Sequence, residues 1–351
     1  MRNLEEVPRL HLANLPTPFY ELKRLGKKLG GPRIFIKRDD LTGVAFGGNK
    51  IRKLEFLLAD AIETGCDWVV TTGAFQSNHC TQAAAAASSL GLGITLVKSA
   101  PSADYRPETE DGNHLLQRLF GANIVTASGS EMNDCLESVV ADLRAKGHRP
   151  YVIPDAGSTP VGCLGYVEAM RELSEQVHDA GLKIDHLVHT TGSGGTQAGL
   201  IVGAELFSPN TSIISACSGS TPLPQLTEKI SQRVEAVWKF LGRQKNPAAA
   251  KQVRVLDEYH GGGYGFVSGA KVDAIRTLAT TEGVLLDPVY TAASMAALID
   301  LIKNGTFSGN DVVVYLHSGG GPALFPYRSP IATWMAEGKL AWSSPPWSAK
   351  Y

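Results

Sequence analysis

The feature that most constrains the fold is the alternation of short, apolar, β-branched segments with helical segments along nearly the whole chain. The clearest strand candidates are DWVVTT (67–72), DHLVHTT (185–191), SIISACS (212–218) and VVVYLHS (312–318). Strands that are apolar on both faces are typical of parallel sheets covered by helices on both sides. We therefore predict an α/β fold built on a mostly parallel, doubly covered sheet.

Length and composition narrow the possibilities further. A chain of 351 residues exceeds one ordinary core, and the order of segments between residues 54 and 155 indicates a smaller α/β unit inserted into a larger one. The net charge of -1 gives no reason to expect nucleic acid as a partner. We find no apolar run of 18 residues and no signal peptide, so we expect no membrane partner and a cytoplasmic location. The five cysteines are scattered without metal-ligand spacing, which predicts free thiols and no metal site.

The stretch FGGNKIRKLEFLLADA (46–61) predicts a helix that Asn49 caps. Its first turn carries Lys50, Arg52 and Lys53 at the positive end of the helix dipole, where each cation costs about 0.3–1 kcal/mol. Lys37 and Arg38 add further positive charge just upstream. Clustered cations favour a neutral lysine, the nucleophile of Schiff bases, and they also hold anions. We predict that Lys50 or Lys53 carries a carbonyl cofactor; the alternative is a solvated basic helix start.

The stretch HTTGSGGTQAG runs from a predicted strand through a glycine-rich turn into a helix. Gly192, Gly194 and Gly195 let the backbone N–H groups approach an anion, and Ser193 and Thr196 add hydroxyl donors. It is neither a Walker sequence nor a complete dinucleotide fingerprint. We predict a site for a small phosphate ester; the alternative is a turn without a ligand.

A second strand-to-helix turn contains Ser77, Asn78 and His79. Their hydroxyl, amide and imidazole groups suit a substrate carboxylate or a ring oxygen at the carboxyl end of a strand. The alternative, which does not exclude ligand binding, is helix capping by Ser77 or Asn78.

Three further candidates lie in later loops. Tyr264 in GGGYG and Tyr290 in LLDPVY are flanked by Gly or Pro and could gate a site or transfer protons; the alternative is packing. Ser318 follows the last strand, where its hydroxyl could bond a ring nitrogen.

Taken together, seven motifs resemble those of one enzyme family: IKRDDLTG, GGNKIRKLEF, QSNH, TGSGGTQAG, GYG, LLDPVY and LHSGGGPALF. They span about residues 35–327 and resemble the tryptophan-synthase-β-like superfamily, fold type II of the pyridoxal-phosphate enzymes. The match is closer to the branch that contains D-cysteine desulfhydrase and 1-aminocyclopropane-1-carboxylate (ACC) deaminase. The resemblance implies two open, twisted, mostly parallel sheets covered by helices and a homodimer. It also implies a large domain of residues 1–53 and 161–351 and a small domain of residues 54–160.

The resemblance also implies residue roles, with pyridoxal 5'-phosphate as the cofactor and an amino acid as the substrate. Lys50 would form the Schiff base, and Lys53 with the loop 192–196 would hold the phosphate. Asn78 would bond the ring hydroxyl of the cofactor. The residues implied to face the substrate or flank the reacting carbon are Ser77, His79, Tyr264 and Tyr290.

Two positions distinguish activities within the branch. ACC deaminases have Glu where this chain has Thr291, and desulfhydrase-like members have a hydroxyl residue at the position of Ser318. A neutral hydroxyl leaves the ring nitrogen unprotonated, which suffices when a good β leaving group departs. The resemblance therefore favours β-elimination, first from D-cysteine, to pyruvate, ammonia and hydrogen sulfide. L-cysteate sulfo-lyase, β-chloroalanine elimination, ACC deaminase and a non-catalytic cofactor-binding protein remain alternatives. Phe75 and Thr81 depart from the pattern of the branch and indicate an altered pocket.

Overall fold

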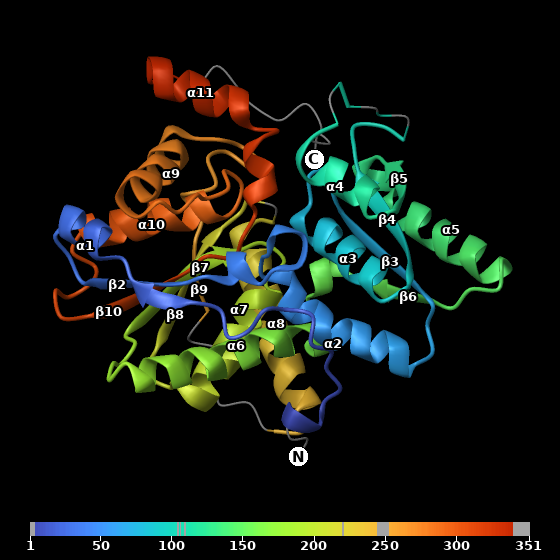
Figure 1. Cartoon of the computed structure of the whole chain (residues 1–351), viewed down its shortest axis with the longest axis horizontal. Coiled ribbons are helices and arrows are strands. Elements are labelled where there is room, and N and C mark those ends of the chain that lie inside the picture. The colour runs from blue at the N-terminus through green and yellow to red at the C-terminus, as the bar shows by residue number, and fades with distance from the viewer. Residues whose placement is uncertain are drawn as a thin grey trace.

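The computed structural model describes residues 4–103, 105, 107–108, 110–219, 221–243 and 253–339 (Figure 1). The strands are β1 (Phe19–Glu21), β2 (Arg33–Lys37), β3 (Trp68–Ala74), β4 (Gly93–Ser99), β5 (Asn123–Ala127), β6 (Pro150–Ile153), β7 (His186–Thr191), β8 (Ser212–Cys217), β9 (Arg254–Leu256) and β10 (Val312–Leu316). The α-helices are α1 (Lys23–Leu29), α2 (Lys50–Glu63), α3 (Asn78–Ser89), α4 (Gly112–Leu119), α5 (Met132–Ala145), α6 (Pro160–Asp179), α7 (Gly195–Phe207), α8 (Leu223–Phe240), α9 (Gly269–Glu282), α10 (Thr291–Lys303) and α11 (Arg328–Glu337).

The larger sheet contains six strands in the order β1-β2-β10-β7-β8-β9. Neighbouring strands are parallel except β1 and β2, which are antiparallel. Strand β10 lies between β2 and β7, so strands from both ends of the chain are side by side. Apolar residues of α6, α7 and α8 pack on one face, and those of α1, α9 and α10 pack on the other. These two helical layers lie below and above the sheet in Figure 1.

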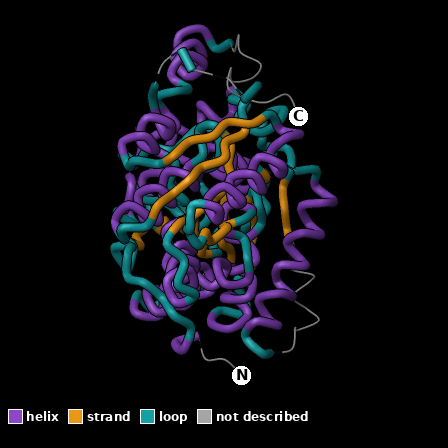
Figure 2. The backbone as a smooth tube through the Cα atoms, turned by 90° about the vertical axis from the view of Figure 1, so that its right-hand side faces the viewer, coloured by secondary structure: helices purple, strands orange, loops and turns teal. Residues whose placement is uncertain are grey.

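The smaller sheet contains four parallel strands in the order β5-β4-β3-β6. Helices α2 and α3 pack on one face, and α5 packs on the other. In the view turned by 90°, helices surround the strands (Figure 2). The expected α/β class with two mostly parallel, helix-covered sheets is confirmed. The four strands fall inside the segment 54–160 assigned to the small domain, and the exact domain limits stay a prediction.

The first turn of α2 is fixed by a buried ion-pair network. The guanidinium of Arg52 is fully buried and donates to both carboxylate oxygens of Asp39 at 2.8 Å. It also donates to Glu172 of α6 at 2.9 and 3.0 Å. Gly165 lets α6 approach, because a Cβ there would lie 2.2 Å from the carbonyl oxygen of Arg52. The start of α2 is therefore held rigidly against α6.

The positive charge upstream of α2 is neutralised, so our interpretation of residues 37–38 was wrong. Lys37 forms an ion pair with Glu172, and Arg38 donates to Asp40 at 2.7 and 2.8 Å. The sequence could not reveal the partner of Lys37, because Glu172 is more than 130 residues away from it. The two lysines in the first turn of α2 differ, since no carboxylate of the described residues forms an ion pair with either of them.

The segment from residue 328 to the end of the chain is rich in Pro and Trp. Its first part forms α11, whose Trp334 donates to Asp273 of α9 at 3.0 Å. Residues 340–351 lie outside the described residues. None of the described helices is both long enough and apolar enough to cross a membrane.

Candidate active site

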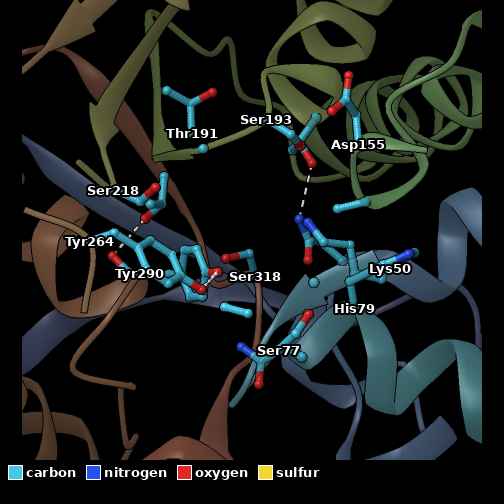
Figure 3. A pocket seen from close by; sticks show the side chains of 18 of the residues that line it. Lys50, Ser77, His79, Asp155, Thr191, Ser193, Ser218, Tyr264, Tyr290 and Ser318 are labelled. Atoms are coloured by element: carbon cyan, nitrogen blue, oxygen red, sulfur yellow. Dashed lines mark hydrogen bonds between the residues drawn. The ribbon is translucent and has the colours of Figure 1, made fainter. Parts of the chain in front are cut away.

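A cavity of about 350 Å³ lies where the carboxyl ends of parallel strands from both sheets meet (Figure 3). Residues at or just after the ends of β3, β4, β7, β8 and β10 line it, among them Ala74, Ser99, Thr191, Ser218 and Ser318. In open α/β sheets this edge is where ligands bind.

The cavity brings together most of the predicted site residues. Those that line it are Lys50, Ser77, Asn78, His79, Gly192, Ser193, Gly194, Thr196, Tyr264, Tyr290 and Ser318. Three others, Lys53, Gly195 and Thr291, are not among the lining residues. Figure 3 shows Lys50 and His79 on one side of the cavity and the two tyrosines on the other.

Lys50 is the first residue of α2, and the residues before it set its position. Gly47 has a φ of 74°, and a Cβ there would lie 2.0 Å from the carbonyl oxygen of Asp40, so only glycine fits. The side chain of Asn49 does not cap α2 as we expected. Instead its Nδ2 donates to Thr196 Oγ1 at 3.0 Å, which ties the start of α2 to the glycine-rich loop.

The surroundings of Lys50 favour its neutral form. Burial lowers the pKa of the Lys50 amine well below its ordinary value, and the nearby charge of Lys53 lowers it further. The residue nevertheless lines the cavity, so a neutral amine faces the site. Such an amine is the nucleophile that adds to a carbonyl group.

The loop of residues 192–196 leads into the N-terminus of α7, where backbone N–H groups are free to bind an anion. A Cβ on Gly195 would lie 2.3 Å from Ser158 Oγ and 2.7 Å from Lys53 Nζ. The hydroxyl of Ser158 accepts from Lys53 Nζ at 3.2 Å and lies 2.7 Å from Ser193 Oγ. Glycine therefore allows one backbone turn to contact two hydroxyl groups and an amine.

Lys53 lies behind this loop, where it is 1% exposed. Burial lowers its pKa to about 8; Arg233 lowers it further, whereas Cys163 and Asp155 raise it. A buried ammonium group requires a compensating charge. A phosphate bound at the start of α7 would supply that charge.

Other polar atoms also indicate a ligand. Three buried atoms of lining residues have no hydrogen-bond partner within the described part of the chain: His79 Nδ1, Ser99 Oγ and Thr191 Oγ1. Buried polar groups in native proteins are nearly always hydrogen-bonded. A polar ligand in the cavity would supply the hydrogen bonds that these three atoms lack. A neutral amine for an aldehyde and an anion loop for a phosphate fit the cofactor that the resemblance implies.

Helix α3 begins at the second predicted turn, and capping and cavity lining occur together there. Ser77 Oγ caps α3 by accepting from the backbone N–H of Cys80 at 3.2 Å, and Ser77 also lines the cavity. Asn78 Oδ1 accepts from Asn113 Nδ2 at 2.7 Å. The first N–H groups of α3 form the positive end of the helix dipole, and a carboxylate is favoured there.

The tautomer of His79 follows from its neighbours. The hydroxyl of Thr71 donates to the carbonyl oxygen of Ile153 at 2.7 Å, so it accepts from His79 Nε2 at 2.9 Å. The proton is thus on Nε2, and Nδ1 carries a lone pair. Burial lowers the pKa of His79 well below its ordinary value, with Lys50 and Lys53 adding to the effect, so the ring is neutral.

The two predicted tyrosines form a pair. Their hydroxyl groups lie 2.5 Å apart, and burial, followed by the effect of Tyr264, raises the pKa of Tyr290 well above its ordinary value. Asp287 holds Tyr290 in place because its carboxylate accepts from the backbone N–H groups of Val289 and Tyr290, both at 2.9 Å. Asp287 lies three residues before Tyr290 in LLDPVY, where an Asp side chain can accept from the backbone of the turn that follows.

Three residues that we expected to influence the substrate do not line the cavity. Thr291 is fully buried, and its hydroxyl donates to Asp287 Oδ1 at 2.7 Å. Thr81 is 1% exposed, and Phe75 is 2% exposed with its ring stacked on His114. Any effect of these side chains on a substrate therefore passes through their neighbours.

Several polar residues of the site were not predicted from the sequence; Ser99, Thr191 and Ser218 line the cavity, while Ser158 and Asn113 contact residues that line it. Ser99 ends β4, so a hydroxyl group at the carboxyl end of a strand was the available signal, whereas Ser158 lies five residues after the end of β6. Asn113 gave no signal, because it lies in α4 and reaches the site only through Asn78.

The fold and the cavity define a class: an α/β enzyme that holds a phosphorylated carbonyl cofactor on a lysine. Residues 10–319 match the model of the pyridoxal-phosphate dependent enzymes, and the chain belongs to this family. The predicted family, fold type and cofactor, pyridoxal 5'-phosphate, are confirmed.

Individual relatives agree with this assignment. The chain is 40% identical over 330 residues to the D-cysteine desulfhydrases of Salmonella newport (strain SL254) and Salmonella heidelberg (strain SL476). These matches cover 93% of this chain and 98% of each relative. The crystal structure of an ACC deaminase homologue is 34% identical with a TM-score of 0.85, covering 94% of this chain and 97% of that one. O-ureido-L-serine synthase, at 16% identity and a TM-score of 0.62, shares the fold.

Proposed function

We propose that this enzyme is a carbon–sulfur lyase that eliminates a β-substituent from a small amino acid, with D-cysteine as the favoured substrate. One D-cysteine and one water give pyruvate, ammonia and hydrogen sulfide. The observation that carries the proposal is that Lys50, whose lowered pKa favours the neutral amine, lines the same cavity as the hydroxyl pair of Tyr264 and Tyr290. The similarity to D-cysteine desulfhydrases over nearly the whole chain supports the choice of substrate.

The site residues divide the work of binding. Lys50 would attach the cofactor, and the loop 192–196 with Lys53 would hold its phosphate. Asn78 would contact the ring oxygen, and Ser318 would contact the ring nitrogen. When bound, the cofactor withdraws electrons from the substrate Cα and so makes its proton removable. The N–H groups at the start of α3 and the hydroxyl of Ser77 bind the substrate carboxylate.

Proton transfer follows from the pKa directions. The lowered pKa of Lys50 favours the unprotonated amine, which is available as a base, so Lys50 accepts the proton from Cα. The raised pKa of Tyr290 keeps its hydroxyl protonated, so the tyrosine pair donates a proton to the departing sulfur. Separate groups thus serve as base and acid on opposite sides of the substrate.

The charge of the cavity argues against L-cysteate as the main substrate. Among the described residues that line the cavity, Lys50 is the one Lys or Arg, and its lowered pKa favours the neutral amine, while Asp155 adds a carboxylate. A sulfonate group would therefore bring a second negative charge without a partner. A thiol has no such cost.

ACC deaminase is the second candidate function, and the similarity to the ACC deaminase homologue favours keeping it. Against it, Ser318 would offer the ring nitrogen a hydroxyl group rather than a carboxylate, and Thr291, at the position of the Glu of ACC deaminases, directs its hydroxyl to Asp287. An unprotonated ring withdraws electrons less strongly and suits substrates with a good leaving group. We also propose a cytoplasmic homodimer, as the resemblance implies; light scattering on the purified enzyme tests the dimer.

A keto-acid assay over D-cysteine, L-cysteine, L-cysteate, β-chloro-D-alanine and ACC tests the proposed function. We expect the highest kcat/KM for D-cysteine, with equal amounts of pyruvate and sulfide released. Lys50→Ala should lower turnover about 10³-fold or more, because it removes both the cofactor attachment and the base. Lys183→Ala, at an exposed position, is the control. Release of 2-oxobutanoate from ACC without pyruvate from D-cysteine would instead support the second candidate.

A further inference from the structure

Helix α4 braces the loop that carries Ser77 and Asn78. Gln117 Nε2 donates to the carbonyl oxygen of Ser77 at 3.2 Å. The backbone N–H of Asn113 donates to Gln76 Oε1 at 2.8 Å. All of these side chains except Asn78 are buried, so α4 holds the loop from the side away from the cavity.

The hydrogen bonds fix which way two amides point. Asn113 Nδ2 donates to the backbone carbonyl oxygen of Gln76 at 3.1 Å. A carbonyl oxygen only accepts, so this bond assigns the nitrogen of the Asn113 amide. The same Nδ2 lies 2.7 Å from Asn78, and the atom that it meets must therefore be the acceptor, Oδ1.

This orientation determines what Asn78 offers to a ligand. Its amide has one acceptor atom, Oδ1, and Asn113 uses it. The remaining polar atom is Nδ2, which carries two N–H donors, and Asn78 lines the cavity. Asn78 thus presents donors to the cavity and suits an oxygen that carries negative charge.

We propose that Asn113 is a positioning residue that makes Asn78 a hydrogen-bond donor toward the ring oxygen of the cofactor. The inference rests on the proposed function, in which Asn78 contacts that oxygen. Asn113 does not touch the ligand; it acts by occupying Asn78 Oδ1. The residue is 1% exposed, so the orientation is set before any ligand binds.

Two substitutions separate this role from simple packing. At pH 8 the carboxylate of Asn113→Asp only accepts, so the Asn78 amide must turn its Nδ2 toward α4 and its Oδ1 toward the ring oxygen. Asn113→Ala removes the donor without forcing that reversal. The affinity for pyridoxal 5'-phosphate should fall about 10- to 100-fold in N113D and about 3- to 10-fold in N113A. The visible absorbance maximum of the bound cofactor should shift more in N113D than in N113A.

The controls use cofactor titration and thermal melting of the cofactor-free proteins. Asn123→Asp makes the same chemical change in β5, where Asn123 donates to Thr95 and not to a cavity residue, and it should keep the wild-type dissociation constant. Melting curves establish that each variant is folded. If N113D does not fold, the result for N113A alone decides, since an unchanged dissociation constant and spectrum would overturn the inference.

Weaker binding in N113A than in folded N113D would also overturn it, because packing loss is greater in the alanine variant. A folded N113D variant with the wild-type dissociation constant and absorbance spectrum would overturn it as well. A wild-type protein that gives no cofactor band would overturn the proposed function and, with it, this inference. A wild-type band with unchanged variants would overturn the inference alone.

Discussion

Asp287 illustrates how one buried carboxylate sets the position of a functional side chain. Its oxygens accept from three successive backbone N–H groups, at residues 289–291, and from the hydroxyl of Thr291. Burial raises the pKa of Asp287, and the bonds that it accepts act in the opposite direction. The Asp287 carboxylate therefore holds the backbone before α10 through four accepted hydrogen bonds.

The substitution Asp287→Asn places an NH2 group against donors and should release Tyr290 from its position. We expect kcat/KM for D-cysteine to fall about 10- to 100-fold, since hydrogen bonds to charged groups contribute about 1.5–3 kcal/mol. Steady-state kinetics measures this, with Asp179→Asn at an exposed position as the control. Unchanged kinetics in the folded variant would contradict a role for Asp287 in positioning the tyrosine.

For single residues, the sequence predicted which residue types lie at the site better than it predicted the orientation of their side chains. Lys50, Ser77 and Tyr290 line the cavity as expected, because each lies at a strand-to-helix turn or in a loop that the fold brings to the same edge. Thr291 follows Tyr290 in the sequence, yet its side chain turns back to Asp287. Such a direction depends on a local hydrogen bond that motif spacing does not contain.

The start of α2 shows how an element rather than a residue prepares the site. Arg52 ties it to Asp39 and Glu172, while Lys50 and Lys53 on either side stay unpaired with carboxylates in the described chain. Three cations in one helical turn thus have separate surroundings. The sequence showed the unusual location of the three cations. It did not show that Asp39 and Glu172 are buried beside Arg52 and pair with it alone among the three.

Loss of this anchor should destabilise the enzyme. Arg52→Met leaves Asp39 and Glu172 buried without their partner, so we expect the free energy of unfolding to fall by about 3–5 kcal/mol. Chemical denaturation monitored by fluorescence measures it. Arg33→Met, which removes an exposed ion pair with Glu21, should cost at most about 1 kcal/mol. Equal losses in the two variants would argue against the anchor.

Strand β4 and helix α4 are joined by a buried amine. Lys98 is fully buried, with Nζ 2.8 Å from His114 Nδ1 and 4.0 Å from the centre of the Phe75 ring. Burial lowers the pKa of Lys98 to about 7, against a small opposing effect of Cys80. Burial and Lys98 lower the pKa of His114 to about 4, so both groups are neutral at mildly alkaline pH.

This amine predicts a pH dependence of stability. An unfolded lysine has a pKa of about 10.4, so between pH 7 and 10 the unfolded state binds more protons than the folded state at this position. The contribution of Lys98 to the free energy of unfolding therefore rises as pH rises above 7 and falls as pH returns toward 7. Urea denaturation at pH 7 and pH 9 should show a smaller pH dependence in Lys98→Met than in the wild type. An identical dependence in both proteins would contradict the depressed pKa.

For the whole molecule, apolar strands and glycine-rich turns were enough to predict the class and the edge of the sheets at which the site lies. The buried strands of both sheets follow from local patterns. The placement of β10 between β2 and β7, and of α4 beneath the turn at residues 76–79, depends on contacts between distant segments. That is why the strand-end residues were predictable and Asn113 was not.

The most direct test of the account is to locate the cofactor on the chain. The enzyme loaded with pyridoxal 5'-phosphate is reduced with borohydride, digested and examined by mass spectrometry. We expect the covalently bound pyridoxyl label on Lys50 and its loss in Lys50→Ala. A label on Lys53, or a protein that takes up no label, would contradict it.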